Sequence, residues 1–259
     1  MPLFSMEVSV GGTAWYAWWR PTIENNMRGS DNGYTESGNY TGAYNDTFEN
    51  SQDFLAGPFV SLGFLDRWKL GLVALMSTEY EMKATYNVQN ITTPSDVVDV
   101  VFVSSGRRYD MDSTLSYQLN PYMGLFLGYK LLVYDMDGVY NSTYINLNHS
   151  FDVMMHGPGA GISFSIPVAG PLFIPVSFSF IVMSSTARSL NTYQDTGITY
   201  SDETYEHIFF GYSVSTGIGY YMLDWGTTLV LGGRYQYMRN NKGDRDLFYG
   251  MSLSVIYRL

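Results

Sequence analysis

The sequence predicts an all-β protein, a single antiparallel up-and-down transmembrane β-barrel of about ten strands formed by residues 1–259. Three observations support this fold class. Apolar and polar residues alternate with a period of two over unusually long segments, short and long connections alternate along the chain, and aromatic residues lie near the ends of the segments. The mean hydropathy of −0.08 fits a barrel, because its lipid-facing and lumen-facing residues cancel in the average.

Composition excludes several classes of function. The chain has no cysteine, which excludes a disulfide framework and a thiolate metal site. Its formal net charge of −10 makes it a poor partner for nucleic acid. We find no phosphate-binding glycine loop, zinc-ligand spacing or nucleophile elbow, so we expect no metal and no cofactor. The first ten residues lack the charged and apolar regions of an export signal, so we take the chain as a mature or trimmed form.

The clearest alternation covers residues 67–86. Its even positions are mostly apolar, from Trp68 and Leu70 to Met82 and Tyr86, whereas its odd positions include Lys69, Glu79, Glu81 and Lys83. Strands of soluble proteins usually have about five or six residues, whereas a strand needs about 9–11 residues to cross a bilayer. This segment is therefore long enough to cross a membrane and extend beyond it.

The first five expected strands cover residues 5–20, 53–65, 67–86, 107–119 and 122–136. In each strand one parity carries more of the apolar residues than the other. In the first strand they include Val8, Tyr16 and Trp18, and in the fifth they include Leu125, Leu127 and Val133. Each strand therefore has one face suited to lipid and one suited to a lumen.

The last five expected strands cover residues 150–167, 171–184, 203–222, 225–239 and 246–259. The first of these changes parity: Phe151 and Met155 are at odd positions, whereas Ile162 and Phe164 are at even ones. One inserted residue would keep all of them on the lipid face, so we expect a β-bulge at 156–160. The alternative is an interruption between two shorter strands.

The connections predict the orientation. The short ones contain LDRWK, NPYM, PVAGP and LDWG, and the long polar ones cover about 21–52, 87–106, 137–149, 185–202 and 240–245. Short turns on one side and long loops on the other are typical of these barrels. The apolar face of the last strand ends at Leu259. It resembles the C-terminal strand signal of bacterial outer-membrane proteins, although those signals usually end in Phe or Trp.

This resemblance is to outer-membrane barrels as a class, and ten-stranded omptin-like and Opc-like proteins are nearest in size. It implies an integral protein of the bacterial outer membrane with periplasmic turns and extracellular loops. It also implies contact with membrane lipid and lipopolysaccharide, and with the barrel-assembly machinery during insertion.

Aromatic residues near the segment ends predict two girdles at the headgroup levels. The expected girdle residues are Trp18, Trp68, Tyr80, Tyr117, Tyr220, Trp225, Tyr237 and Tyr257. The alternative is the ordinary preference of aromatic residues for strands.

Polar residues on the opposite parity predict the lumen. The expected lumen-lining residues are Lys69, Glu79, Glu81, Lys83, Arg108, Asp110, Asp112, Lys130, Asp152, Arg234, Gln236 and Arg258. Both signs of charge are present, so a salt-bridge network that fills the barrel is favoured over a narrow polar pore.

Four residues are candidates for catalysis. We expect Asp110, Asp112, His156 and His207 to project inward, where a His–carboxylate pair could act as a general base, as the resemblance to omptins suggests. Packing or ion pairing is the favoured role for them, and we expect no enzyme.

Two loops could bind an extracellular partner. The loop at 21–52 is rich in acidic residues, and the loop at 87–106 contains the apolar run 97–103. This run could form a hairpin above the membrane, fold inward as a plug or bind another molecule, and we rank the hairpin first. The leading function is a porin-like narrow or closed pore with loops available for binding. The alternatives are a surface adhesin and, with less support, an omptin-like hydrolase.

Overall fold

The computed structural model describes residues 6–20, 40–42, 47–48, 51–90, 97–141, 146–243 and 245–259. Most of the loop at 21–52 and residues 91–96 of the loop at 87–106 lie outside these ranges, so their expected binding roles cannot be placed in the fold. None of the helices among the described residues has the length and apolar character needed to cross a membrane.

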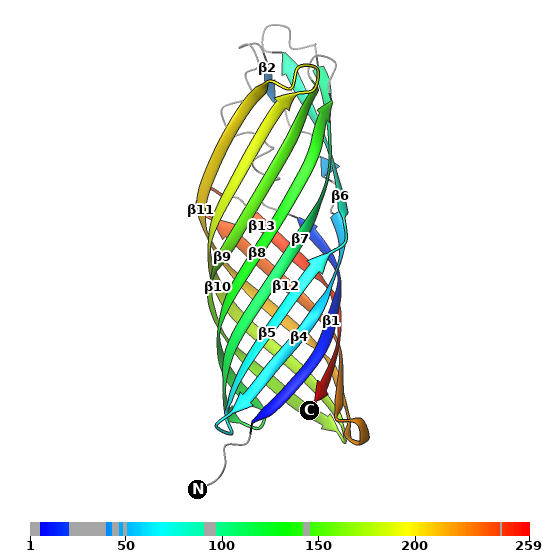
Figure 1. The fold of residues 1–259 in the computed structure, drawn as a ribbon, viewed down its shortest axis with the longest axis vertical. Coiled ribbons are helices and arrows are strands. Elements are labelled where there is room, and N and C mark those ends of the chain that lie inside the picture. Colours follow the sequence, from blue (N-terminus) through cyan, green and yellow to red (C-terminus); the bar gives the residue numbers. More distant parts are fainter. Residues whose placement is uncertain are drawn as a thin grey trace.

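The described strands close into one antiparallel barrel (Figure 1). Its strands are β1 (Glu7–Arg20), β4 (Ser51–Phe64), β5 (Trp68–Ser77) with its continuation β6 (Tyr80–Asn90), β7 (Val97–Asn120), β8 (Met123–Asn141), β9 (Asn146–Ala169), β10 (Leu172–Tyr193), β11 (Thr199–Met222), β12 (Thr227–Asn240) and β13 (Arg245–Arg258). Each pairs with the next along the chain, and β13 pairs with β1. The predicted ten-stranded barrel is confirmed.

Tight turns join the strands at one end, where β1 also begins and β13 ends (Figure 1). The turn after β4 holds Leu65 and Asp66 at positive φ, and the turns after β9 and β11 use Gly170 and Gly226 in the same region. A short 3-10 helix, η1 (Leu223–Trp225), precedes Gly226. Glycine is favoured at two of these turns because it adopts positive φ without a steric penalty.

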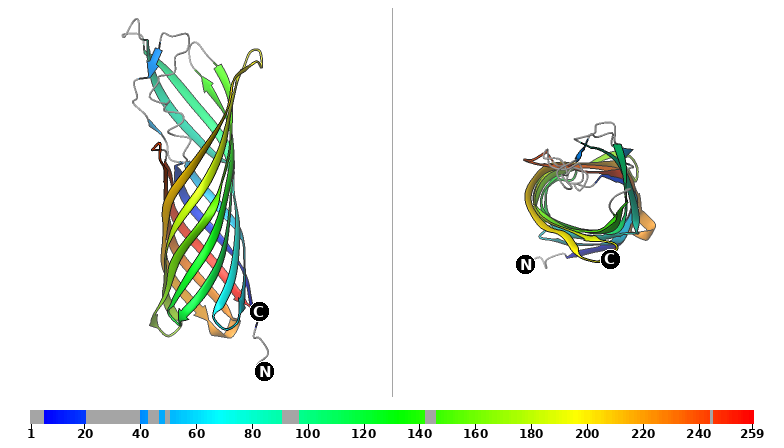
Figure 2. Two further views of the ribbon diagram at one scale, coloured as in Figure 1. Left: turned by 90° about the vertical axis from the view of Figure 1, so that its left-hand side faces the viewer. Right: turned by 90° about the horizontal axis from the view of Figure 1, so that it is seen from above.

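Five strands form a wall that rises above the rest of the barrel. Strands β7 to β11 have 19 to 24 residues, whereas β1, β4, β12 and β13 have 14 each. Figure 2 shows this wall extending beyond the β12–β13 hairpin. Residues 97–103 belong to it as the first part of β7, paired with residues 83–89 of β6, so the strand pairing of the expected hairpin is confirmed. Two small strands, β2 (Tyr40–Gly42) and β3 (Thr47–Phe48), pair with β6.

A bulge separates β5 from β6 and changes which residues face the lumen. Met76 pairs with Tyr109 and Tyr80 with Gly106, so Thr78 and Glu79 together oppose the single residue Arg107. After this extra residue Tyr80 and Met82 turn inward and are buried, while Glu79, Glu81 and Lys83 are exposed on the outer face. The expected lumen positions of Glu79, Glu81 and Lys83 and the girdle position of Tyr80 are therefore wrong.

Strand β9 has no bulge at 156–160. Its register with β8 is constant from Asn146 to Phe164, so one face of the strand is continuous. Phe151, Val153 and Met155 are buried inside the barrel, whereas Ile166 is exposed on the outer face. The bulge prediction is wrong because it assumed that Phe151, Val153 and Met155 face lipid, whereas these three residues face inward.

Candidate functional site

A network of buried ion pairs crosses the lumen. Arg108 of β7 donates two hydrogen bonds to Asp110, from Nε to Oδ1 at 2.8 Å and from Nη2 to Oδ2 at 3.1 Å. Lys130 of β8 bridges Asp110 and Asp112, with Nζ–oxygen distances of 3.2 and 3.0 Å. Arg234 of β12 reaches Asp112 at 3.3 Å. Because β7 and β12 are not neighbours in the barrel, this last pair spans the interior.

Aromatic rings extend the network. The guanidinium carbon of Arg108 lies 4.4 Å from the ring centroid of Phe248 and 4.7 Å from that of Trp19. The guanidinium of Arg234 lies 4.8 Å from the ring of Trp15 and also donates to Ser213. Arg108 is 0% exposed, which is tolerated because its charge is paired and stacked on rings.

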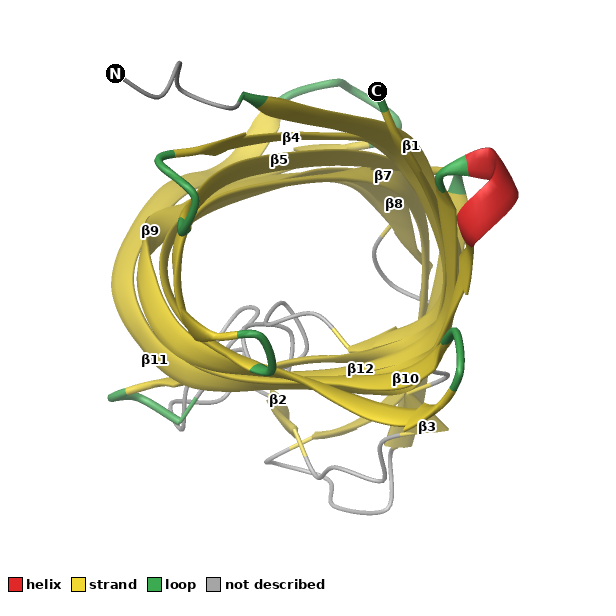
Figure 3. Cartoon of the chain, turned by 90° about the horizontal axis from the view of Figure 1, so that it is seen from below, coloured by secondary structure: helices red, strands yellow, loops and turns green. Residues whose placement is uncertain are grey.

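An apolar cluster packs against this network inside the barrel, whose strands are seen from below in Figure 3. Trp19 makes edge-to-face contacts with Tyr80 and Tyr134, at centroid distances of 5.0 and 4.8 Å. The cluster draws buried side chains from around the barrel, among them Leu55, Met155, Met183, Phe209, Met238 and Phe248. Side chains from opposite walls thus meet in the interior, and these residues are almost fully excluded from solvent.

Two buried carboxylates complete the interior and were not among the expected lumen residues. Asp246 of β13 accepts a hydrogen bond from Trp19 Nε1 at 3.2 Å. Asp53 of β4 is 1% exposed, and neither of its oxygens has a hydrogen-bond partner among the described residues. Asp53 has the same parity as Leu55 and Gly57, which face inward, so the alternation of the strand is the signal that could have placed Asp53 in the lumen.

Near the turns the interior opens into a cavity of about 600 Å³. Glu7, Lys69, Gln118 and Ser163 are among the residues that line it, and Arg258 at its edge forms an ion pair with Glu7 at 3.0 Å. Lys69 and Arg258 therefore lie at this mouth of the barrel, away from the ion-pair network that contains Arg108, Asp110, Asp112, Lys130, Arg234 and Gln236.

The outer face carries an apolar band with aromatic residues near its margins. Trp68 packs on Tyr117 and Trp18 stacks on Tyr249, at centroid distances of 4.9 and 5.6 Å. Tyr220, Trp225 and Tyr257 are exposed beside the turns, and Tyr237 lies toward the other end of β12. Of the expected girdle, only Tyr80 is turned inward.

The expected catalytic residues do not come together. Asp110 and Asp112 are held in the ion-pair network, whereas His156 lies on the outer face, where its Nδ1 is 2.7 Å from the Tyr129 hydroxyl. His207 lies in the raised part of β11, opposite Ser185 of β10. Asp152, expected in the lumen, is exposed on the outer face of β9. His156 and Asp152 are both misplaced in the prediction because β9 lacks the expected bulge.

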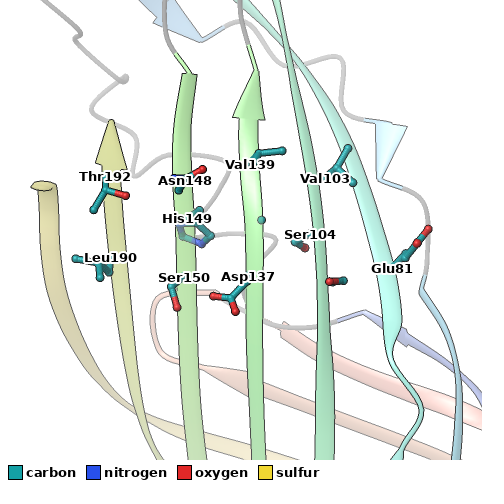
Figure 4. A pocket seen from close by; sticks show the side chains of 12 residues that line it. Glu81, Val103, Ser104, Asp137, Val139, Asn148, His149, Ser150, Leu190 and Thr192 are labelled. Carbon is teal, nitrogen blue, oxygen red and sulfur yellow. The ribbon is translucent and has the colours of Figure 1, made fainter. Parts of the chain in front are cut away.

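A second cavity of about 600 Å³ lies in the raised wall (Figure 4). Asp137 of β8 and Ser150 of β9 are register partners and lie beside each other there. His149, which sequence reasoning overlooked, is buried, and its Nδ1 lies 2.8 Å from Asn191 Oδ1. Within the described ranges, no group of three His, Cys, Asp or Glu residues is placed to hold a metal ion.

No family model and no curated protein matches the chain. Among solved structures, the outer membrane protease OmpT from Escherichia coli matches with a TM-score of 0.58 at 10% identity, covering 99% of this chain and 96% of that chain. The fold is that of an outer-membrane β-barrel. The β-domain of the Bordetella autotransporter BrkA matches with a TM-score of 0.46 at 10% identity, covering 98% and 100% of the two chains. The transport unit of the Escherichia coli autotransporter AIDA-I matches with a TM-score of 0.42 at 9% identity, covering 98% and 90%.

Proposed function

We propose that this protein is a closed, non-conducting outer-membrane barrel that presents its raised wall outside the cell as a binding surface. The observation that carries the proposal is the set of contacts across the lumen. Arg234 reaches Asp112 from the opposite wall, and Trp19 packs on Tyr134 with both residues almost fully buried. This favours the closed form of the expected pore, with surface binding as the function.

The interior opposes ion flow in two successive layers. An ion that entered from the cavity near the turns would first meet two cations, Arg108 and Lys130, and two carboxylates, Asp110 and Asp112, which neutralise one another. It would then have to enter the apolar cluster around Trp19, where nothing replaces its hydration shell. Both layers would have to rearrange before a hydrated ion could pass.

The outer face supports the proposed placement of the wall. The apolar band of β8 to β10 includes Leu127, Met154 and Phe180, which are exposed and suited to lipid. Farther from the turns, the same faces carry charges, including Asp135 and Arg188. A lipid-facing strand is apolar inside the bilayer and polar beyond it, so the upper parts of these strands stand in water.

Single-channel recording in planar bilayers tests this function. We expect the wild-type protein to be silent and Trp19→Ala/Phe248→Ala to give small steps, because these two rings contact Arg108 across the lumen. Trp18→Ala/Tyr249→Ala is a matched control: its rings come from the adjacent positions on the same two strands and stack on the outer face. Reproducible steps from the wild-type barrel would contradict the proposal.

A further inference from the structure

One edge of the raised wall has no neighbouring strand among the described residues. Strand β11 pairs with β10 as far as Thr199, but its pairing with β12 stops where Phe209 meets Asn240. Within the described ranges, residues 199–208 therefore pair with a strand on one side only, namely β10. Figure 1 shows β11 at the margin of the wall, and Figure 2 shows the lower β12–β13 hairpin beside it.

The opposite edge of the wall is covered in part. Strand β6 pairs with β7 on one side and with the short strands β2 and β3 on the other. An uncovered edge presents backbone N–H and C=O groups in the geometry that a further strand would use. The edge of β11 is thus a place in the described wall where ten successive residues leave room for an extended segment to add to the sheet.

The side chains of this edge select the charge of such a segment. Residues 199–208 contain Asp202, Glu203 and Glu206 and neither lysine nor arginine. Asp202 is paired with Arg188 of β10 at 2.8 Å, whereas Glu206 has an exposed side chain with no ion pair in the described part of the chain. Opposite charges on facing strands stabilise a pair and like charges destabilise it.

We propose that residues 199–208 bind an extended, lysine- or arginine-containing segment of another protein by β-strand addition. Backbone hydrogen bonds supply the affinity in this binding mode, and side chains on alternate positions supply the specificity. Ile208, which is 55% exposed, offers an apolar contact at the end of the edge nearest the membrane. The proposal rests on the proposed function, because the edge must face the medium outside the cell.

A second copy of this chain is a poor occupant of the same edge. Antiparallel pairing of two copies centred on Thr204 places Asp202 opposite Glu206, and pairing centred on Glu203 places two glutamates opposite each other. These like charges keep two such edges apart, as charged residues on exposed edges commonly do. A basic segment meets the same acids with the favourable sign.

The test measures binding of a ten-residue peptide of alternating Lys and Thr to the full barrel in detergent at low salt, by fluorescence anisotropy. Hydrogen exchange then measures how strongly the bound peptide protects the backbone amides of residues 199–208. We expect binding that slows exchange there, and loss of binding when the peptide carries Glu for Lys or N-methyl groups at alternate amides.

Two charge-reversal variants separate a local site from general attraction. Glu203→Lys/Glu206→Lys changes the edge, and Asp135→Lys/Asp137→Lys makes the same change in net charge on the exposed outer face of β8. We expect the first to weaken binding by about tenfold or more and the second by much less. Absence of binding, equal weakening in both variants, or binding without slowed exchange would overturn the proposal. If the wild-type barrel is silent in bilayer recordings but the peptide test fails, the strand-addition proposal is wrong and the closed, non-conducting barrel is still supported.

Discussion

Replacing Asp110 by asparagine removes the counter-charge of Arg108 while keeping the shape of the side chain. Arg108 donates two hydrogen bonds to Asp110, and the two side chains are 0% and 3% exposed. Breaking a buried pair from one side typically costs about 3–5 kcal/mol, because the remaining charge stays buried. The amide oxygen of the new side chain can still accept one hydrogen bond, so we expect a loss of roughly 3 kcal/mol in the free energy of unfolding.

Urea unfolding in lipid vesicles, followed by tryptophan fluorescence, measures this loss. Asp202→Asn is the control, because it breaks the exposed pair with Arg188, and we expect no resolvable shift of its midpoint. Arg108→Met/Asp110→Leu removes both charges and leaves Lys130 paired with Asp112, so we expect it to regain most of the lost stability. Equal stability of Asp110→Asn and Asp202→Asn would refute the buried network.

Two further predictions concern the backbone. A Cβ on Gly11 would lie 2.0 Å from the Val255 carbonyl oxygen, whereas one on Gly12 would have its nearest neighbour at 3.7 Å. We expect Gly11→Ala to lower the free energy of unfolding in urea by about 1–3 kcal/mol and Gly12→Ala to leave it nearly unchanged; the reverse order would contradict the close approach of β1 and β13. Deleting Thr78 removes the bulge and keeps every other residue on its face, so we expect a barrel that still shows heat-modifiable gel migration. Deleting Leu132 from the regular β8 should abolish that migration, because one end of the strand must turn its faces over.

Period-two alternation identified the fold and all ten barrel strands, because it reports which residues share a face. It does not report which face is turned to lipid. In the turn-proximal half, charged residues such as Lys69 mark the lumen and resolve the choice. In the outer half, Tyr80, Met82 and Phe151 are apolar and face inward, so the rule that apolar residues face lipid fails there.

The lengths of the strands were underestimated at the ends away from the turns, for a related reason. The expected loops at 87–106, 137–149 and 185–202 are largely strand in the structure. Beyond the bilayer the outer face meets water, so polar residues such as Asp137 and Arg188 occupy strand positions that resemble loop composition. Contacts such as Arg234 with Asp112 join residues 122 apart in the chain, and a single sequence does not reveal which inward charges meet.

The seam between β1 and β13 has a consequence for how the protein folds. Across it the Thr13 and Ser254 hydroxyls lie 2.7 Å apart, although 241 residues separate them in the chain. Until these two strands meet, the nascent sheet has two long edges. The backbone N–H and C=O groups on those edges have no hydrogen-bond partner, and lipid cannot supply one. The lumen network also stays incomplete, since Trp19 and Phe248 stand on opposite sides of the seam. Contacts this distant in sequence form slowly, so closure of the seam is expected to be the rate-limiting step of assembly.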